Sequence, residues 1–396
     1  MTKDSKILFL TRCARLFAYG LLSVVLVLYL TGLGLSESQT GLLFTLTLVG
    51  DTAISLLLTT RADRLGRRRM LIAGAILMAA AGFVFASTGS FVILLIAGTI
   101  GIISPSGNEV GPFLPIEQAS LAHVVSPQKR TEIFAQYSLA GSLATATGAL
   151  AGGAIMQAFH GNARGVVMLY GAMGLVLALL FSRLSFLIEV SEPAPNATWG
   201  VSRSKAVVTK LSALFALDAF GGGFVVQTFA AYWFHLRWGV SASTLGAIFF
   251  GANLFAAISA LLASRLAARI GLIRTMVFTH LPSNVLLIMV PLMPTLPLAI
   301  LILLLRFSIS QMDVPARQSY TMAIVPPEER SAVAGITGVV RTAGAALAPV
   351  FAGMMFERPA WIDAPFYIAG GLKIAYDILL YRAFISRTTD EPLDRF

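Results

Sequence analysis

Long apolar stretches alternate with short polar links from Ile7 almost to the C-terminus. Crossing a hydrocarbon core takes roughly 20 helical residues, and a backbone in lipid must satisfy its own polar groups. The pattern therefore predicts an all-α integral membrane protein with twelve transmembrane helices. The expected spans are 7–32, 39–60, 70–88, 91–123, 131–157, 163–187, 207–236, 241–264, 275–293, 296–324, 331–355 and 364–384.

Composition agrees with this pattern, because only 12% of the residues are charged, where a soluble domain has about 25%. The first span carries Arg12 and Arg15 and has no small-residue cleavage site, so we interpret it as a retained helix and not a signal peptide. The lone Cys13 excludes an internal disulfide.

Basic residues are concentrated in the links on one side of the predicted helices. The links on the other side hold only Arg164, Arg237 and Arg358 of the 29 lysines and arginines. This asymmetry predicts that both termini are cytoplasmic and that the protein lies in the cytoplasmic membrane. The basic links are expected to contact anionic lipids, so the net charge of +10 does not indicate nucleic acid.

The chain repeats itself at an offset of about 200 residues. The stretch "PIEQASLAHVVSPQKR" from Pro115 matches "PARQSYTMAIVPPEER" from Pro315. A parallel repeat of six helices predicts two pseudo-symmetric bundles, with a binding site between them near the bilayer midplane. The predicted division is an N-terminal bundle (1–188), a polar cytoplasmic linker (189–206) and a C-terminal bundle (207–396).

The link after the second helix reads "RADRLGRRRM" and resembles the loop signature of the major facilitator superfamily. A degenerate copy follows the eighth helix, with Ala268 in place of the acid, while Thr59 stands where the family usually has glycine. The resemblance implies a transporter in which the aspartate caps a neighbouring helix terminus and latches the closed cytoplasmic gate. The alternative is an anchor that only fixes topology. The matching residues are Asp63, Arg64, Gly66, Arg67 and Arg68.

Ionisable side chains within the bilayer are costly and normally face a cavity or a partner. The resemblance implies that helices one, four, seven and ten line the transport path and that two, five, eight and eleven flank it. Most of the intramembrane charges fall on these helices. We predict that the substrate or proton pathway includes Arg15, Asp51, Glu109, Asp218, Asp313 and Arg341, with Arg12, Glu117, Arg306 and Arg317 nearby.

Two pairings and one side-chain direction are expected among the intramembrane charges. Arg15 aligns with Asp218 in the repeat, so the two are either an ion pair between the halves or substrate ligands. Arg317 is expected to extend towards the cytoplasm. On the twelfth helix Lys373 and Asp377, four residues apart, are expected to neutralise each other as a structural pair.

Asp51 lies about twelve residues into the second helix, near mid-depth. A carboxylate without a partner there favours its neutral form and can carry a proton as the cavity alternates. The alternative is a permanent ion pair with Arg15 or Arg341.

The small-residue strings "GALAGG" from Gly148 and "APVFAG" from Ala348 partly resemble a signature of proton-coupled drug exporters. We therefore predict a secondary active transporter that works as a monomer and moves a small solute together with protons by alternating access. Export is favoured over uptake or exchange of an organic anion or an inorganic oxyanion. A membrane enzyme or a receptor is the remote alternative. The four histidines are dispersed, so no metal or other cofactor is expected.

Overall fold

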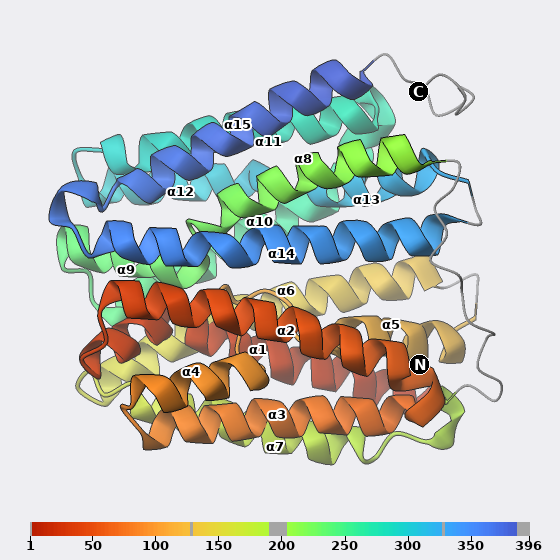
Figure 1. Ribbon diagram of the computed structural model, residues 1–396, viewed down its shortest axis with the longest axis horizontal. Helices are drawn as coiled ribbons and strands as arrows, with labels where there is room; N and C mark the ends of the chain where they lie inside the picture. The colour runs from red at the N-terminus through yellow and green to blue at the C-terminus, as the bar shows by residue number, and fades with distance from the viewer. Residues whose placement is uncertain (1, 127–129, 190–203, 327–328, 386–396) are drawn as a thin grey trace. The chain divides into compact units, whose positions relative to one another are not determined.

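The computed structural model describes residues 2–126, 130–189, 204–326 and 329–385, and over these ranges it contains helices and no strands (Figure 1). Ten helical spans in this part of the chain are long and apolar enough to cross a membrane. The two predicted spans outside that set are the fourth, which is broken, and the last, which is helical as predicted. The predicted all-α membrane fold is confirmed, and each of the twelve predicted spans contains helix in the described residues.

The elements of the N-terminal half follow the predicted spans closely. The sixth span is shorter than predicted, because its helix ends at Phe181 and a 3₁₀ turn follows. The helices are α1 (Lys3–Gly32), α2 (Glu37–Leu65), α3 (Arg67–Ser87), α4 (Phe91–Ile100), α5 (Phe113–Val124), α6 (Arg130–Ala158) and α7 (Arg164–Phe181), with η2 (Phe186–Ile188) after them.

In the C-terminal half, two predicted spans are each divided into two helices. The span 207–236 is interrupted between α8 and α9, and the span 296–324 between α12 and α13. The helices are α8 (Lys205–Gly223), α9 (Gln227–Trp238), α10 (Ala242–Ile270), α11 (Leu272–Met289), α12 (Leu296–Ser310), α13 (Asp313–Ala323), α14 (Arg330–Phe356) and α15 (Ala364–Phe384), with η3 (Val290–Leu292) and η5 (Pro359–Trp361) between them.

The fourth span is the clearest departure from the sequence prediction, which treated 91–123 as one helix. Residues 101–112, "GIISPSGNEVGP", separate α4 from α5 and are not helical (Figure 1). Gly107 and Gly111 have φ angles of 70° and 81°, which residues with a Cβ rarely adopt, and proline cannot donate a helical hydrogen bond. Non-helical backbone at membrane depth occurs where it is buried in protein or lines a polar cavity.

The internal repeat recurs in the element boundaries. Helices α5 and α13 begin at Phe113 and Asp313, which are 200 residues apart. The sharp turns at Gly66 and Gly271 have φ angles of 101° and 88° and are 205 residues apart. The repeat read from the sequence is therefore a repeat of structure.

By its internal packing the chain divides into two compact units. The first unit comprises Met1–Pro195 and Val226–Asn253, and the second comprises Asn196–Val225 and Leu254–Phe396. The predicted bundle boundaries stay a prediction, and most of the predicted linker lies outside the described residues.

Small residues on α6 bring its backbone against α1 within the first unit. A Cβ added to Gly148 would overlap the carbonyl of Phe17, and one added to Gly152 would overlap the carbonyl of Leu21. The small residues of "GALAGG" thus allow close contact between the backbones of α6 and α1. It holds α1, with its two arginines, firmly in the unit.

Candidate functional site

In the first unit, Arg15 on α1 and Glu117 on α5 form a bidentate ion pair. Arg15 Nη1 donates to Oε1 and Nη2 to Oε2, each at 2.8 Å, and neither side chain is exposed. Thr11 and Tyr137 also donate to this carboxylate, at 2.9 and 2.5 Å. Glu117 is therefore fully engaged, as a buried charge must be.

Glu109 extends this cluster from the non-helical stretch between α4 and α5. Arg12 Nη1 donates to its Oε1 at 2.5 Å, and Arg15 Nη2 lies 3.2 Å from its Oε2. The guanidinium of Arg12 also stacks 4.4 Å from the ring centre of Tyr137. The break in the fourth span thus places a carboxylate beside the two arginines of α1.

Asp51 on α2 differs from the other two acids of this unit. It is 4% exposed, and its Oδ1 accepts no hydrogen bond from the described residues. The Gly111 backbone and the Ser55 hydroxyl face the carboxylate. Among the described residues of this unit, Arg15 is engaged by two glutamates and Asp51 forms no ion pair.

In the second unit, Asp218 on α8 is the centre of a buried polar cluster. Its Oδ1 accepts from Lys373 Nζ at 2.6 Å and lies 3.6 Å from His280 Nε2. Its Oδ2 accepts from Arg317 Nη1 at 3.3 Å and from Arg341 Nη1 at 3.2 Å. One carboxylate therefore faces charges from α11, α13, α14 and α15.

Two further acids complete the second cluster. Asp313 accepts from Arg317 at 2.8 Å, one helical turn away on α13. Asp377 on α15 bonds His280 Nδ1 at 2.8 Å and accepts from Asn284 at 2.9 Å. His280 thus lies between two carboxylates, although no sequence pattern singles it out among the four scattered histidines.

The two clusters repeat one another with their charges exchanged. Arg15 and Asp218 occupy corresponding positions 203 residues apart, and Glu117 and Arg317 correspond at 200. Each half therefore has one ion pair between its first helix and its fourth, with the cation on α1 in one case and on α13 in the other. The predicted Arg15–Asp218 pair is not needed to neutralise either charge, because each is neutralised within its own unit.

Two sequence predictions about this cluster are wrong. Lys373 and Asp377 do not pair with each other, because Lys373 reaches Asp218 while Asp377 bonds His280. Arg317 does not extend away, since it is 7% exposed and held between two aspartates. Both errors arose because spacing along one helix says nothing about partners on the neighbouring helices.

Arg306 on α12 lies apart from these ion pairs. Its Nε is buried and has no hydrogen-bond partner among the described residues. Its guanidinium lies 4.9 Å from the ring centre of the adjacent Phe307. The structure therefore gives Arg306 an aromatic contact in place of a carboxylate.

The basic loop between α2 and α3 is tied to the end of the sixth span. Asp63 Oδ1 accepts from Arg67 Nε at 2.8 Å within the loop. Glu189 accepts from the backbone N–H groups of Arg67 and Arg68 at 2.6 and 3.2 Å, at the first turn of α3. A carboxylate suits this end of the helix dipole. Sequence reasoning missed Glu189, which belonged to no motif.

A chain of hydrogen bonds joins α9 to α1, α2 and α10 in the first unit. Gln227 donates to Ser23 at 2.6 Å and accepts from Asn253 at 3.1 Å. Tyr232 donates to Glu37 at 2.5 Å, at the start of α2. These polar contacts hold α9 against the first unit.

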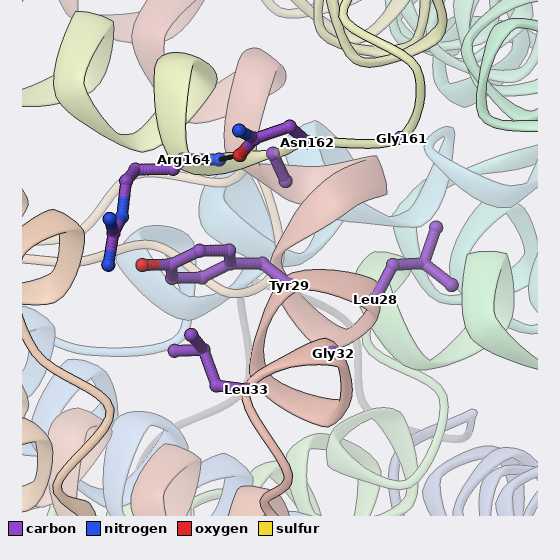
Figure 2. A pocket seen from close by; sticks show the side chains of 8 residues that line it. Leu28, Tyr29, Gly32, Leu33, Gly161, Asn162 and Arg164 are labelled. Atoms are coloured by element: carbon purple, nitrogen blue, oxygen red, sulfur yellow. Dashed lines mark hydrogen bonds between the residues drawn. The ribbon is translucent and has the colours of Figure 1, made fainter.

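A pocket of about 260 Å³ lies near the end of α1 and the start of α7. Figure 2 shows the Tyr29 hydroxyl directed towards the guanidinium of Arg164. The hydroxyl also donates to the carbonyl of Phe85 at 2.7 Å. This pocket contains none of the predicted pathway residues.

A family profile described as the Major Facilitator Superfamily matches residues 8–305 and 211–395. The chain belongs to this superfamily of transporters. It is 31% identical over 425 residues to the uncharacterized membrane protein YJR124C of Saccharomyces cerevisiae, across 97% of this chain and 94% of that protein. It is also 26% identical over 213 residues to the quinolone resistance protein NorA of Staphylococcus aureus, across 54% of this chain and 52% of NorA.

Solved structures of transporters share the fold. The nucleoside transporter NupG, as its D323A mutant, superimposes with a TM-score of 0.79 at 13% identity and covers 96% of this chain and 100% of its own. A bacterial homolog of the human lysosomal transporter Spinster gives a TM-score of 0.70 at 19% identity, with coverages of 97% and 96%. The human organic anion transporter MFSD10 (TETRAN) gives 0.65 at 20%, with coverages of 95% and 98%. The superfamily resemblance read from the loop motif is confirmed.

Proposed function

We propose that this superfamily member is a proton-coupled secondary active transporter that exports a small organic solute across the cytoplasmic membrane by alternating access. In this proposal the protein works as a monomer with both termini in the cytoplasm, as the distribution of basic residues predicts. The superfamily membership supports transport, and the buried state of Asp51 supports coupling to protons.

The observation that carries the proposal is the contrast among the acids of the first unit. Glu117 and Glu109 both face arginines, whereas the buried Oδ1 of Asp51 has no hydrogen-bond partner among the described residues. In a low-dielectric environment a carboxylate without a cation favours the neutral form, while water entering its surroundings favours the charged form. Asp51 is therefore suited to bind and release a proton as its access to water changes.

A permanent ion pair of Asp51 with Arg15 is the competing explanation. Arg15 has both guanidinium nitrogens Nη1 and Nη2 on Glu117 and a further contact to Glu109. An arginine so engaged has little capacity for a third carboxylate, which supports the coupling role of Asp51.

Export rests on two weaker observations. The small-residue string on α6 packs closely on α1, as the resemblance to proton-coupled exporters implies. In addition, the partial sequence match includes a protein named for quinolone resistance. Uptake or exchange would use the same residues with the gradients reversed.

The test uses purified protein in proteoliposomes that contain a pH-sensitive dye. A fluoroquinolone, uridine and benzoate are offered in turn with an imposed proton gradient, and both solute and proton movement are measured. We expect a solute that moves against the proton flux. Asp51→Asn should abolish gradient-driven accumulation and preserve passive exchange, while Glu132→Gln, at an exposed acid on α6, should behave as wild type. A folded Asp51→Asn protein that still accumulates solute would contradict the coupling role.

A further inference from the structure

Asp218 accepts hydrogen bonds from three cations, Arg317, Arg341 and Lys373. Arg317 has a second, shorter ion pair with Asp313 at 2.8 Å, and Lys373 approaches Asp218 to 2.6 Å. Arg341 donates one side-chain hydrogen bond in the described part of the chain, from Nη1 to Oδ2 of Asp218 at 3.2 Å. A guanidinium carries five N–H donors, so most of the hydrogen-bonding capacity of Arg341 is unused.

Arg341 is also the most accessible cation of the cluster. Its side chain is 32% exposed, compared with 8% for Arg317 and 11% for Lys373. A cation in a membrane-spanning helix with free donors and exposed surface normally faces a cavity or an anion. The accessible side of this cluster is therefore a guanidinium.

We propose that Arg341 binds the carboxylate group of an organic anion, which takes the place of Asp218 as the partner of its guanidinium. This inference rests on the proposed transport function and names the class of solute. The planar fork of arginine donates two parallel hydrogen bonds to a carboxylate, and the contact with Asp218 places a carboxylate oxygen beside Nη1. Asp218 then keeps Lys373 and Arg317 as partners when the solute takes Arg341.

The charge balance of the cluster favours a monoanion over a dianion such as phosphate. The three carboxylates and the three permanent cations of the cluster cancel. A monoanion adds one negative charge to this balance, whereas a dianion adds two beside three carboxylates, which repel it. The balanced groups are Asp218, Asp313 and Asp377 with Arg317, Arg341 and Lys373.

The first test measures equilibrium binding of radiolabelled benzoate to the purified protein in detergent, without a proton gradient. The wild type is expected to bind benzoate and not benzylammonium. Arg341→Ala should weaken benzoate binding at least about tenfold, because a hydrogen bond between two charged groups is lost. Arg274→Ala, which removes an exposed arginine at the start of α11, is the matched control and should leave binding unchanged.

The second test separates a binding role from a structural one. Asp218→Asn removes the competing carboxylate, so benzoate should bind this variant several-fold more tightly and raise its melting temperature more than that of wild type. A purely structural role for the Asp218–Arg341 contact predicts instead that both substitutions weaken binding equally.

A third measurement needs no substitution and holds even where Asp218→Asn does not fold. In the wild type, benzoate should slow the modification of Arg341 by phenylglyoxal, followed by mass spectrometry, and leave the modification of Arg274 unchanged.

The proposal is overturned by a wild type that does not bind benzoate, by normal binding in Arg341→Ala, or by unprotected Arg341. Proton-coupled transport of another solute without benzoate binding overturns the carboxylate site alone, and benzoate binding without proton coupling overturns the coupling alone.

Discussion

Arg15 and Glu117 meet through two parallel hydrogen bonds of 2.8 Å each, with no part of either side chain exposed. The pair joins α1 to α5 directly after the break in the fourth span. Removing one partner of such a pair leaves a desolvated charge uncompensated, which is more costly than removing both. This pair is therefore expected to stabilise the first unit, whereas Asp51 is proposed to bind and release the proton.

Glu117→Gln and Arg15→Ala should each destabilise the purified protein, by about 3–5 kcal/mol if the buried pair behaves like others. The double substitution should cost less than the sum of the two. Thermal melting in detergent measures all three variants, with Glu132→Gln as an exposed control. Additive effects would show that the two charges do not depend on each other.

Gly148→Ala should destabilise the protein, because the new Cβ would overlap the carbonyl of Phe17 where α6 meets α1. Overpacking of this kind costs about 1–3 kcal/mol. Gly165→Ala on α7 is the matched control, since no atom lies within 4 Å of its added Cβ. A helical glycine without such contacts gains about 0.5–1 kcal/mol on replacement by alanine. Equal melting temperatures for the two variants would argue against the tight contact.

The loop after α2 allows two roles to be separated. Asp63 is exposed over 52% of its side chain, so Asp63→Asn should leave folding intact and impair transport by weakening the closed cytoplasmic gate. Glu189→Gln removes the charge that accepts two N–H groups at the start of α3 and should lower stability by about 1 kcal/mol. Transport rates in proteoliposomes and melting temperatures measure the two effects. Normal transport by a well-expressed Asp63→Asn protein would leave the loop as a topology anchor.

Local patterns in the sequence were sufficient for the membrane spans and their repeat, but not for the breaks within three of these spans. Apolar stretches of membrane length gave twelve spans, and the match between Pro115 and Pro315 anticipated that α5 and α13 begin 200 residues apart. These features depend on hydropathy and on the types of neighbouring residues, which can be read from each segment alone. The same is true of the turn at Gly66, where the φ of 101° suits glycine.

The partners of the intramembrane charges were decided only by tertiary structure. The sequence placed Arg15, Asp218 and Lys373 within the membrane but assigned the wrong partner to Lys373, and it did not single out His280 or Glu189. A charge in lipid must find a counter-ion, and this requirement can be read from one segment. Which counter-ion it finds depends on how helices far apart in the chain pack together, and no local spacing contains that information.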